Sequence, residues 1–258
     1  MKVQLLPSTI DENFRASQRQ HLLSMIIDDS VAIDAGCLAL SCTDLHRQQV
    51  RNIVLTHTHL DHIAGLPLFL DDLFATLKEP VCIHATAEQI KIIERDLFNW
   101  AIYPRFSELS NDNGPVIRYQ EFERGATFSV RHLTVKSVPV NHKVSANGFI
   151  VSDGKISIAI TGDTRESDEI WKACNEAPNM KAAFVECAFP NELGELASVS
   201  DHLTPERVKI ELEKINDRDF PAFVINIKPM YRERVINQLK EAEISNLEIL
   251  EIGKVYEF

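Results

Sequence analysis

One short segment constrains this chain more than any other feature, because it places three histidines and an aspartate at the end of an apolar run. The run Asn52–Leu55 leads through a threonine into His57, and His59, Asp61 and His62 follow within five residues. Alternate side chains of a β-strand share one face, so His57 and His59 are expected to point the same way. Asp61 and His62 come where the strand must turn into a helix. The segment therefore predicts one corner of a site for two metal ions.

Three more residues of ligand type stand where an apolar strand ends or a loop begins. His142 follows an apolar run that ends at Val140, and Asp163 follows the run Ile156–Thr161 with one glycine between them. His202 lies just ahead of a helical pattern that starts at Pro205. One cluster cannot complete two coordination shells, so these three residues are the candidates for the remaining ligands.

Short apolar runs alternate with longer helical patterns along the whole chain. Expected strands are Lys2–Leu6, Leu22–Asp28, Val31–Asp34, Ile53–Thr56, Val81–His84, Val116–Tyr119, Thr127–Val140, Gly148–Val151, Ile156–Thr161, Ala182–Glu186, Ala222–Ile227 and Leu247–Glu257. Expected helices are Ile63–Leu77, Ala87–Phe98, Glu166–Asn175, Pro205–Ile215 and Tyr231–Ala242. The turn Ser152–Lys155 predicts a hairpin. No linker or repeat interrupts this pattern, so we expect a single mixed α/β domain over residues 1–258.

Charge and hydropathy limit the partners. The 258 residues carry 27 Lys and Arg against 38 Asp and Glu, a net charge of −11, with no basic cluster of the kind that a long nucleic acid requires. A small anionic substrate is compatible with this charge. No uncharged run approaches the length of a membrane span, and the first residues have no apolar region of a secretory signal. We therefore expect a cytoplasmic protein without a membrane partner.

These residues resemble the metallo-β-lactamase fold superfamily, whose signature is HxHxDH followed by separated His, Asp and His ligands. The resemblance covers roughly residues 30 to 230, includes the turn Asp34–Gly36, and implies an α/β fold, a four-layer αββα sandwich. It implies two divalent metal ions, with zinc favoured and iron or manganese as alternatives. Carried over, one ion is held by His57, His59 and His142, the other by Asp61, His62 and His202, and Asp163 bridges them. A homodimer is also suggested.

Within the superfamily, the chain looks like the class II cyclic-nucleotide phosphodiesterases. The matching elements are His57–Leu66, Gly148–Ile150, Gly162–Thr164, Glu186–Asn191, His202–Pro205 and Ile227–Pro229. The chain departs from the family at Pro67–Asp71, beside the first motif. The resemblance implies hydrolysis of a 3′,5′-cyclic nucleotide, cAMP or cGMP, by a metal-bridging hydroxide that attacks phosphorus and yields the 5′-nucleotide.

Several roles and rival functions stay open at this point. Asp61 is a candidate for protonating the leaving oxygen, as are a metal-bound water and a further side chain. Lys228 either contacts phosphate or is a solvated lysine, and Thr204 either donates to phosphate or caps a helix. The aromatic stretch Phe98–Phe106 either covers the site, forms an interface or simply packs. Rival functions are a lactonase or thioesterase, a tRNA 3′-processing nuclease, and a non-catalytic metal or nucleotide sensor.

Overall fold

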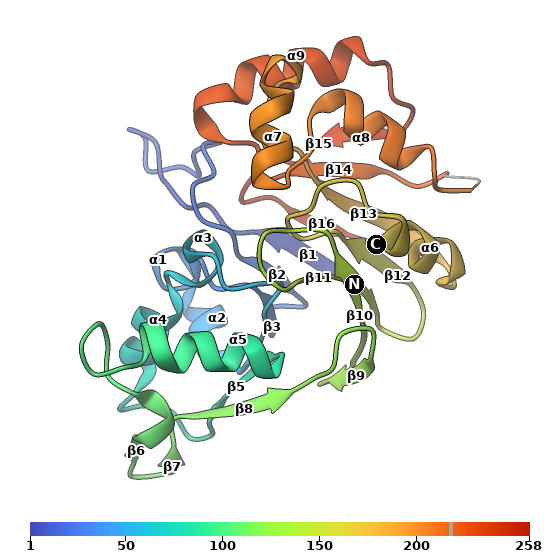
Figure 1. Cartoon of the computed structure of the whole chain (residues 1–258). Coiled ribbons are helices and arrows are strands. Elements are labelled where there is room, and N and C mark those ends of the chain that lie inside the picture. The colour runs from blue at the N-terminus through green and yellow to red at the C-terminus, as the bar shows by residue number, and fades with distance from the viewer. Residues whose placement is uncertain (217–218) are drawn as a thin grey trace. The chain divides into compact units, whose positions relative to one another are not determined.

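A computed structural model describes residues 1–216 and 219–258, which fold as two compact units. The first unit comprises Met1–Ser17, Leu22–Glu123 and Ile252–Glu257. The second comprises Gln18–His21, Arg124–Glu251 and Phe258. Each unit contains one large sheet (Figure 1). The expectation of a single domain over 1–258 stays a prediction.

The first unit is built on a seven-stranded mixed sheet. Its strand order is β16 (Val255–Glu257), β1 (Lys2–Leu5), β2 (Met25–Ile27), β3 (Val31–Ile33), β4 (Asn52–Val54), β5 (Val81–Ala85) and β8 (Ile117–Glu121). Strands β3, β4, β5 and β8 run parallel, and the remaining neighbours are antiparallel. A small ribbon pairs β6 (Ser110–Asn111) with β7 (Gly114–Pro115).

Helices follow the parallel strands of this unit. They are α1 (Leu38–Ser41), α2 (Asp44–Gln49), α3 (Leu60–Ile63), α4 (Leu66–Leu73) and α5 (Ala87–Ile92), which continues as a π-helical turn over Ile93–Leu97. A 3₁₀ turn covers Phe106–Glu108. Leu66, Phe69 and Leu70 of α4 pack with buried strand residues such as Ile53 and Ile83 in one hydrophobic core. The inner parallel strands β3, β4 and β5 are largely buried, as is usual for strands that helices cover, whereas the edge strand β8 is mostly exposed.

The second unit is built on another seven-stranded mixed sheet. Its order is β15 (Leu247–Ile249), β14 (Ala222–Ile225), β13 (Met180–Glu186), β12 (Ser157–Ile160), β11 (Ala146–Ser152), β10 (Leu133–Val140) and β9 (Thr127–Val130). Strands β12 to β15 are parallel. The helices are α6 (Asp168–Glu176), α7 (Gly194–Ser200), α8 (Pro205–Leu212) and α9 (Arg232–Glu241), with 3₁₀ turns at Asn191–Leu193 and Pro229–Tyr231.

The core of the second unit lies between its sheet and three of these helices. Helix α6 packs across β10, β11 and β12, and Figure 1 shows α7, α8 and α9 gathered beside β14 and β15. Trp171 of α6, Val208 of α8 and Leu239 of α9 join the same buried cluster as Val185 of β13. The functional residues described below follow the ends of these strands, which the core holds in place.

Most expected elements are present, and three expectations are corrected. The single strand expected over Thr127–Val140 is a hairpin of β9 and β10, whose turn contains Arg131 at a φ of 54°. The helix expected over Ile63–Leu77 starts earlier and is two helices, α3 and α4, which meet at Gly65. The closing strand expected over Leu247–Glu257 is two strands, β15 and β16, which belong to different sheets. The Ser152–Lys155 hairpin prediction is confirmed by the pairing of β11 with β12.

The aromatic stretch Phe98–Phe106 is partly core. Phe98 and Phe106 are buried and pack edge to face with ring centroids 5.5 Å apart, so simple packing explains both. Trp100 and Ile102 between them are exposed.

Among residues 1–216 and 219–258, none of the helices combines the length and apolar character needed to cross a membrane.

Candidate metal centre

The histidine segment, residues 57–62, leads from β4 into α3 in the first unit. The side chains of His57 and His62 are completely buried, and their ring centroids are 4.0 Å apart. The ring of His59 lies 4.7 Å from that of His57. Asp61, whose side chain is 28% exposed, places Oδ2 4.0 Å from Nε2 of His62. The structure therefore brings together the four residues that the sequence predicts for this corner.

A buried carboxylate, Asp34, orients this segment. It follows β3, and Nδ1–H of His62 donates to its Oδ2 over 2.6 Å. The amide and hydroxyl of Thr56 donate to the same carboxylate over 2.8 and 2.7 Å. Burial raises the pKa of the Asp34 carboxyl, although the neighbouring His62 opposes that shift. A carboxylate bonded to one ring nitrogen fixes the tautomer of a metal-binding histidine, so Nε2 of His62 is its candidate ligand atom.

Thr56, which is held by Asp34, in turn orients the ring of His57. Its Oγ1 lies 3.0 Å from Nδ1 of His57. Because the single hydroxyl proton is donated to Asp34, the threonine oxygen accepts from the imidazole. Nε2 is therefore the candidate ligand atom of His57 as well, and hydrogen bonds within the protein orient both rings.

The turn Asp34–Gly36 is fastened to the start of α3 by backbone contacts. The amide of Ala35 donates to the carbonyl of His62 over 2.7 Å, and the amide of Leu23 donates to the carbonyl of Asp61 over 2.8 Å. A Cβ on Gly36 would lie 1.9 Å from the Asp61 carbonyl oxygen. Only glycine permits this approach of two backbone segments, so Gly36 sets the position of the Asp61 backbone.

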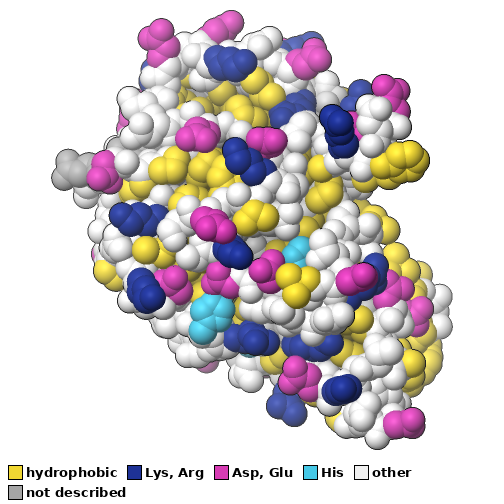
Figure 2. Space-filling view, turned by 180° about the vertical axis from the view of Figure 1, so that it is seen from behind, with side chains coloured by type: hydrophobic (Ala, Val, Ile, Leu, Met, Phe, Trp, Pro, Cys, Tyr) yellow, Lys and Arg dark blue, Asp and Glu magenta, His cyan; other side chains and the backbone are white. Residues whose placement is uncertain are grey.

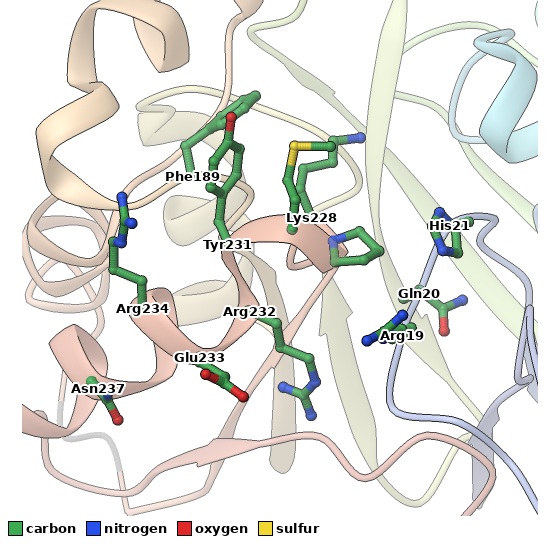
Figure 3. A pocket seen from close by; sticks show the side chains of 12 residues that line it. Arg19, Gln20, His21, Phe189, Lys228, Tyr231, Arg232, Glu233, Arg234 and Asn237 are labelled. Carbon is green, nitrogen blue, oxygen red and sulfur yellow. The ribbon is translucent and has the colours of Figure 1, made fainter. Parts of the chain in front are cut away.

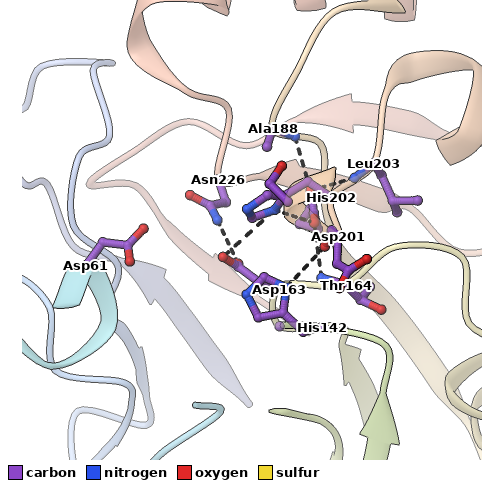
Figure 4. Close-up of polar contacts among 12 residues, drawn as sticks. Asp61, His142, Asp163, Thr164, Ala188, Asp201, His202, Leu203 and Asn226 are labelled. Atoms are coloured by element: carbon purple, nitrogen blue, oxygen red, sulfur yellow. Dashed lines mark hydrogen bonds and ion pairs between the residues drawn. The ribbon is translucent and has the colours of Figure 1, made fainter. Parts of the chain in front are cut away.

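In the second unit, the three separated candidates converge. His142 follows β10, Asp163 follows β12, and His202 lies between α7 and α8. Their ligand atoms all lie within 4.8 Å of one another, and the two imidazole centroids are 5.2 Å apart. Figure 4 shows the three side chains pointing toward one another from separate loops. Sequence separation alone did not fix this convergence, which depends on the order of strands in the sheet.

A second buried carboxylate, Glu186 at the end of β13, orients His202. Its Oε1 accepts from Nδ1–H of His202 over 2.8 Å and from the amide of Thr164 over 3.0 Å. Its Oε2 accepts from the amides of Ala188 and Leu203 over 3.1 and 3.3 Å. Burial opposes protonation of His202, but the charge and hydrogen bond of Glu186 together with the charge of Asp163 outweigh it, so the pKa of His202 is raised.

The other two residues of this group are oriented in a similar way. Nδ1–H of His142 donates to the carbonyl of Asp201 over 3.1 Å, and Nδ2 of Asn226 donates to Oδ1 of Asp163 over 2.6 Å. His142 and His202 thus both use Nδ1 for hydrogen bonds within the protein, so Nε2 is the candidate ligand atom of each. Two imidazoles and a carboxylate form the nitrogen and oxygen donor set of Zn²⁺, iron or manganese. These residues fit a divalent ion.

Sequence reasoning placed Asp34 and Glu186 in motifs without giving either one a role, and it did not single out Asn226. Each of the two carboxylates lies at the end of an apolar strand and is completely buried. Acidic residues are rarely buried unless they are paired. An acidic residue at the end of an apolar strand could therefore have identified Asp34 and Glu186 as functional candidates.

The two residues predicted to bind substrate lie in the second unit. Thr204 is buried at the N-cap position of α8, but its side chain makes no capping hydrogen bond. The capping alternative is therefore wrong for the side chain, although Pro205 does occupy the first turn as expected. Lys228 is partly buried and directly precedes the 3₁₀ turn Pro229–Tyr231. Its positive charge opposes protonation of His202 and so acts to lower the pKa of that imidazole.

Comparison with known families agrees with this geometry. The profile described as "Beta-lactamase superfamily domain" matches residues 31–215. The chain belongs to the beta-lactamase superfamily. Its matched residues include every residue of both clusters, so the resemblance deduced from HxHxDH and the later ligands is confirmed. The expected enzyme class, a metal-dependent hydrolase, agrees with this membership.

Individual superfamily members are distant in sequence. A Yersinia pestis protein named "Probable 3′,5′-cyclic-nucleotide phosphodiesterase" is 22% identical over an alignment of 239 residues that covers 80% of this chain and 67% of the relative. A 3′,5′-cyclic-nucleotide phosphodiesterase of Aliivibrio fischeri is 28% identical over an alignment of 195 residues that covers 67% of this chain. The alignment covers only 56% of that relative's length.

A solved structure shows the fold. The metallo-beta-lactamase fold protein YhfI from Bacillus subtilis superposes with a TM-score of 0.75 at 13% identity and covers 99% of both chains. The predicted fold class, α/β of the metallo-β-lactamase type, is therefore confirmed.

Proposed function

We propose that this chain is a dinuclear-metal phosphodiesterase that hydrolyses 3′,5′-cyclic nucleotides, cAMP or cGMP, to 5′-nucleotides. The observation that carries the proposal is the convergence of His142, Asp163 and His202 with an orienting carboxylate behind His202. The names of the two relatives support the choice of substrate. A small anionic nucleotide is also compatible with two proposed metal cations, whose local positive charge would attract it although the net charge of the protein is −11.

The proposed ligand sets combine both units. His57, His59 and His142 would hold one ion, Asp61, His62 and His202 the other, and Asp163 would bridge them. Bound divalent ions of this kind supply Lewis acidity, which lowers the pKa of water and neutralises charge on a phosphoryl group. Zinc is favoured by the imidazole-rich donor set, with iron or manganese as alternatives.

The protein's own residues would position the ligands and manage protons. Asp34 and Glu186 hold their histidines in one tautomer and one orientation. Asp61 is partly exposed at the start of α3, where its carboxylate would take up the proton released by the attacking water and pass it to the leaving 3′ oxygen. Lys228 would neutralise phosphate charge, and the Thr204 hydroxyl, which does not cap α8, would donate to a phosphate oxygen.

The direct test is turnover by purified protein loaded with Zn²⁺, Mn²⁺ or Fe²⁺. We expect cAMP or cGMP to give the 5′-nucleotide, and we expect a chelator to abolish the reaction. Asp61→Ala should lower kcat by about 100-fold or more, since general acid–base catalysis contributes about that much. Asp112→Ala, which removes an exposed carboxylate in the first unit, serves as the matched control.

The same assay separates the rival functions. Hydrolysis of a homoserine lactone or a thioester without any phosphodiester cleavage would assign the carbonyl chemistry instead. Nucleotide binding without product formation would indicate a sensor. Either outcome would refute the proposed phosphodiesterase.

A further inference from the structure

A separate pocket of about 970 Å³ lies in the second unit. It is formed by two stretches that are far apart in sequence, Arg19–His21 and Lys228–Asn237, together with Phe189 (Figure 3). We call it the arginine pocket. Its volume is at the upper end of the range for small-molecule sites.

The lining of the arginine pocket is cationic. Among the described residues, it contains Arg19, Lys228, Arg232 and Arg234 against one acidic residue, Glu233. Arg234 is ion-paired with Glu192, which is not a lining residue, over 2.8 Å. Elsewhere the charges are mixed, since Figure 2 shows acidic and basic side chains interspersed over the face that it presents. A cationic pocket in a protein of net charge −11 favours an anionic occupant.

Arg232 lines this pocket with a guanidinium of fixed orientation. Its Nε donates to the carbonyl of Gln18 over 2.6 Å, and its Nη2 donates to Oε1 of the same residue over 3.4 Å. These bonds fix the plane of the guanidinium. A guanidinium that is already held in place loses little side-chain freedom on binding, and phosphate oxygens are suitable acceptors for it.

An aromatic wall connects the arginine pocket with the His202 group. The ring of Phe189 lies 5.9 Å from that of Tyr231 in the pocket and 5.7 Å from the imidazole of His202. Cationic side chains combined with aromatic surfaces are the usual means of binding single-stranded nucleotides, because phosphates meet the cations and bases stack on the rings. A substrate at His202 would therefore reach the arginine pocket with its neighbouring nucleotide.

We propose that the arginine pocket binds a second, terminal phosphate of the substrate, so that the chain also hydrolyses 5′-phosphorylated linear dinucleotides. This inference rests on the proposed phosphodiesterase function and extends it beyond cyclic mononucleotides. In the reaction, the oxygen of water bonds to the phosphorus that joins the two nucleosides, and the bond from that phosphorus to the 3′ oxygen breaks. The 3′ oxygen takes up a proton, and the products are two 5′-mononucleotides. The phosphate in the pocket is unchanged.

The test compares two probes that differ only in the terminal phosphate, pApA and ApA. Binding to the metal-free protein is measured by titration calorimetry, and kcat/KM is measured with metal. We expect pApA to exceed ApA by at least about tenfold in both measurements, since a charge-assisted hydrogen bond contributes about that much. The ratio should fall to near one in Arg232→Gln and in Arg19→Gln. Arg95→Gln, which removes an exposed guanidinium of the first unit, should leave the ratio unchanged.

Two variants are needed because Arg232 also fastens residue 18, and a circular dichroism melt checks that each variant is folded. Equal binding and equal turnover of pApA and ApA by the native chain would overturn the pocket assignment while leaving the phosphodiesterase intact. Preferential binding of pApA without hydrolysis of pApA, ApA or cAMP would instead refute the phosphodiesterase function, and with it the dinucleotide activity.

Discussion

Asp34 and Glu186 are both completely buried, and each accepts a hydrogen bond from a histidine that the sequence marks as a metal ligand. Each carboxylate also accepts hydrogen bonds from backbone amides of other segments. The orientation of each histidine therefore depends on its carboxylate, and the position of the carboxylate depends on the folded backbone. We therefore expect Asp34 and Glu186 to affect both the metal affinity and the stability of the chain.

Replacing Glu186 by glutamine tests this coupling. Glutamine has the same shape, but its NH₂ group would face either the amides of Ala188 and Leu203 or the ring N–H of His202, and no rotamer satisfies both. We expect zinc affinity, measured by chelator competition, to fall about 10- to 100-fold. Glu169→Gln, on the exposed face of α6, should bind zinc like the native chain. Equal affinities in the two variants would rule out an orienting role for Glu186.

His84 gives a pH-dependent prediction away from both clusters. It is buried in β5, its Nε2 bonds to Oδ1 of Asn52 over 2.9 Å, and burial lowers its pKa to about 4. The neutral ring is thus favoured in the folded chain, and stability is lost as the pH falls from about 6.5 toward 4. The loss attributable to His84 should reach about 3 kcal/mol at pH 4.

The measurement is denaturant unfolding of the native chain and of His84→Gln at pH 7.5 and pH 4. The difference in unfolding free energy between the two proteins should shift by about 3 kcal/mol in favour of the variant at the lower pH. His132→Gln, at an exposed position, should show no such shift. A pH-independent difference for His84→Gln would contradict the assignment.

At the scale of elements, the turn after β3 and the start of α3 act as one piece. Gly36 allows the two backbones to touch, and Gly65 packs against the same turn, where an added Cβ would lie 2.7 Å from the Ala35 carbonyl oxygen. Gly65 also marks the break between α3 and α4. The break lets α3 follow the histidine segment while α4 turns to bury Leu66, Leu70 and Leu73 in the core.

Gly36→Ala should therefore be strongly destabilising. Its Cβ would lie 1.9 Å from one backbone atom and 2.7 Å from another, so the start of α3 must move. We expect a loss of about 3 kcal/mol or more in unfolding free energy. Gly194→Ala is the matched control, since its Cβ would meet only an arginine side chain at 3.9 Å at the start of α7. That variant should be neutral or slightly more stable.

At the scale of the whole molecule, the mixed α/β class and the histidine segment could be predicted because they depend on local patterns, whereas the grouping of His142, Asp163 and His202 was implied by the resemblance to a known superfamily. The apolar run before His57 and the HxHxDH spacing are visible without coordinates. The β9–β10 turn was not predicted because it places Arg131 in a left-handed backbone conformation, which is uncommon for arginine, so the residue type gives no indication of a turn. The separate sheets of β15 and β16, and the bonds of Asp34 and Glu186, depend on contacts between distant segments.

Metal binding should also stabilise the whole chain. A ligand that binds only the folded state raises the unfolding free energy by about 2.7 kcal/mol at 100 times its Kd. We expect the midpoint of thermal unfolding to rise with added zinc and to fall with a chelator. The rise should shrink in His202→Ala and persist in His132→Ala. The same rise in both variants would show that zinc stabilises the chain through another site.

The proposed dinuclear centre is tested most directly by counting metal ions. Elemental analysis of the purified, zinc-reconstituted chain should find about two ions per chain, and Asp163→Ala, which removes the proposed bridge, should retain fewer. A native chain that holds close to zero ions after reconstitution would contradict the proposed centre and the reaction assigned to it.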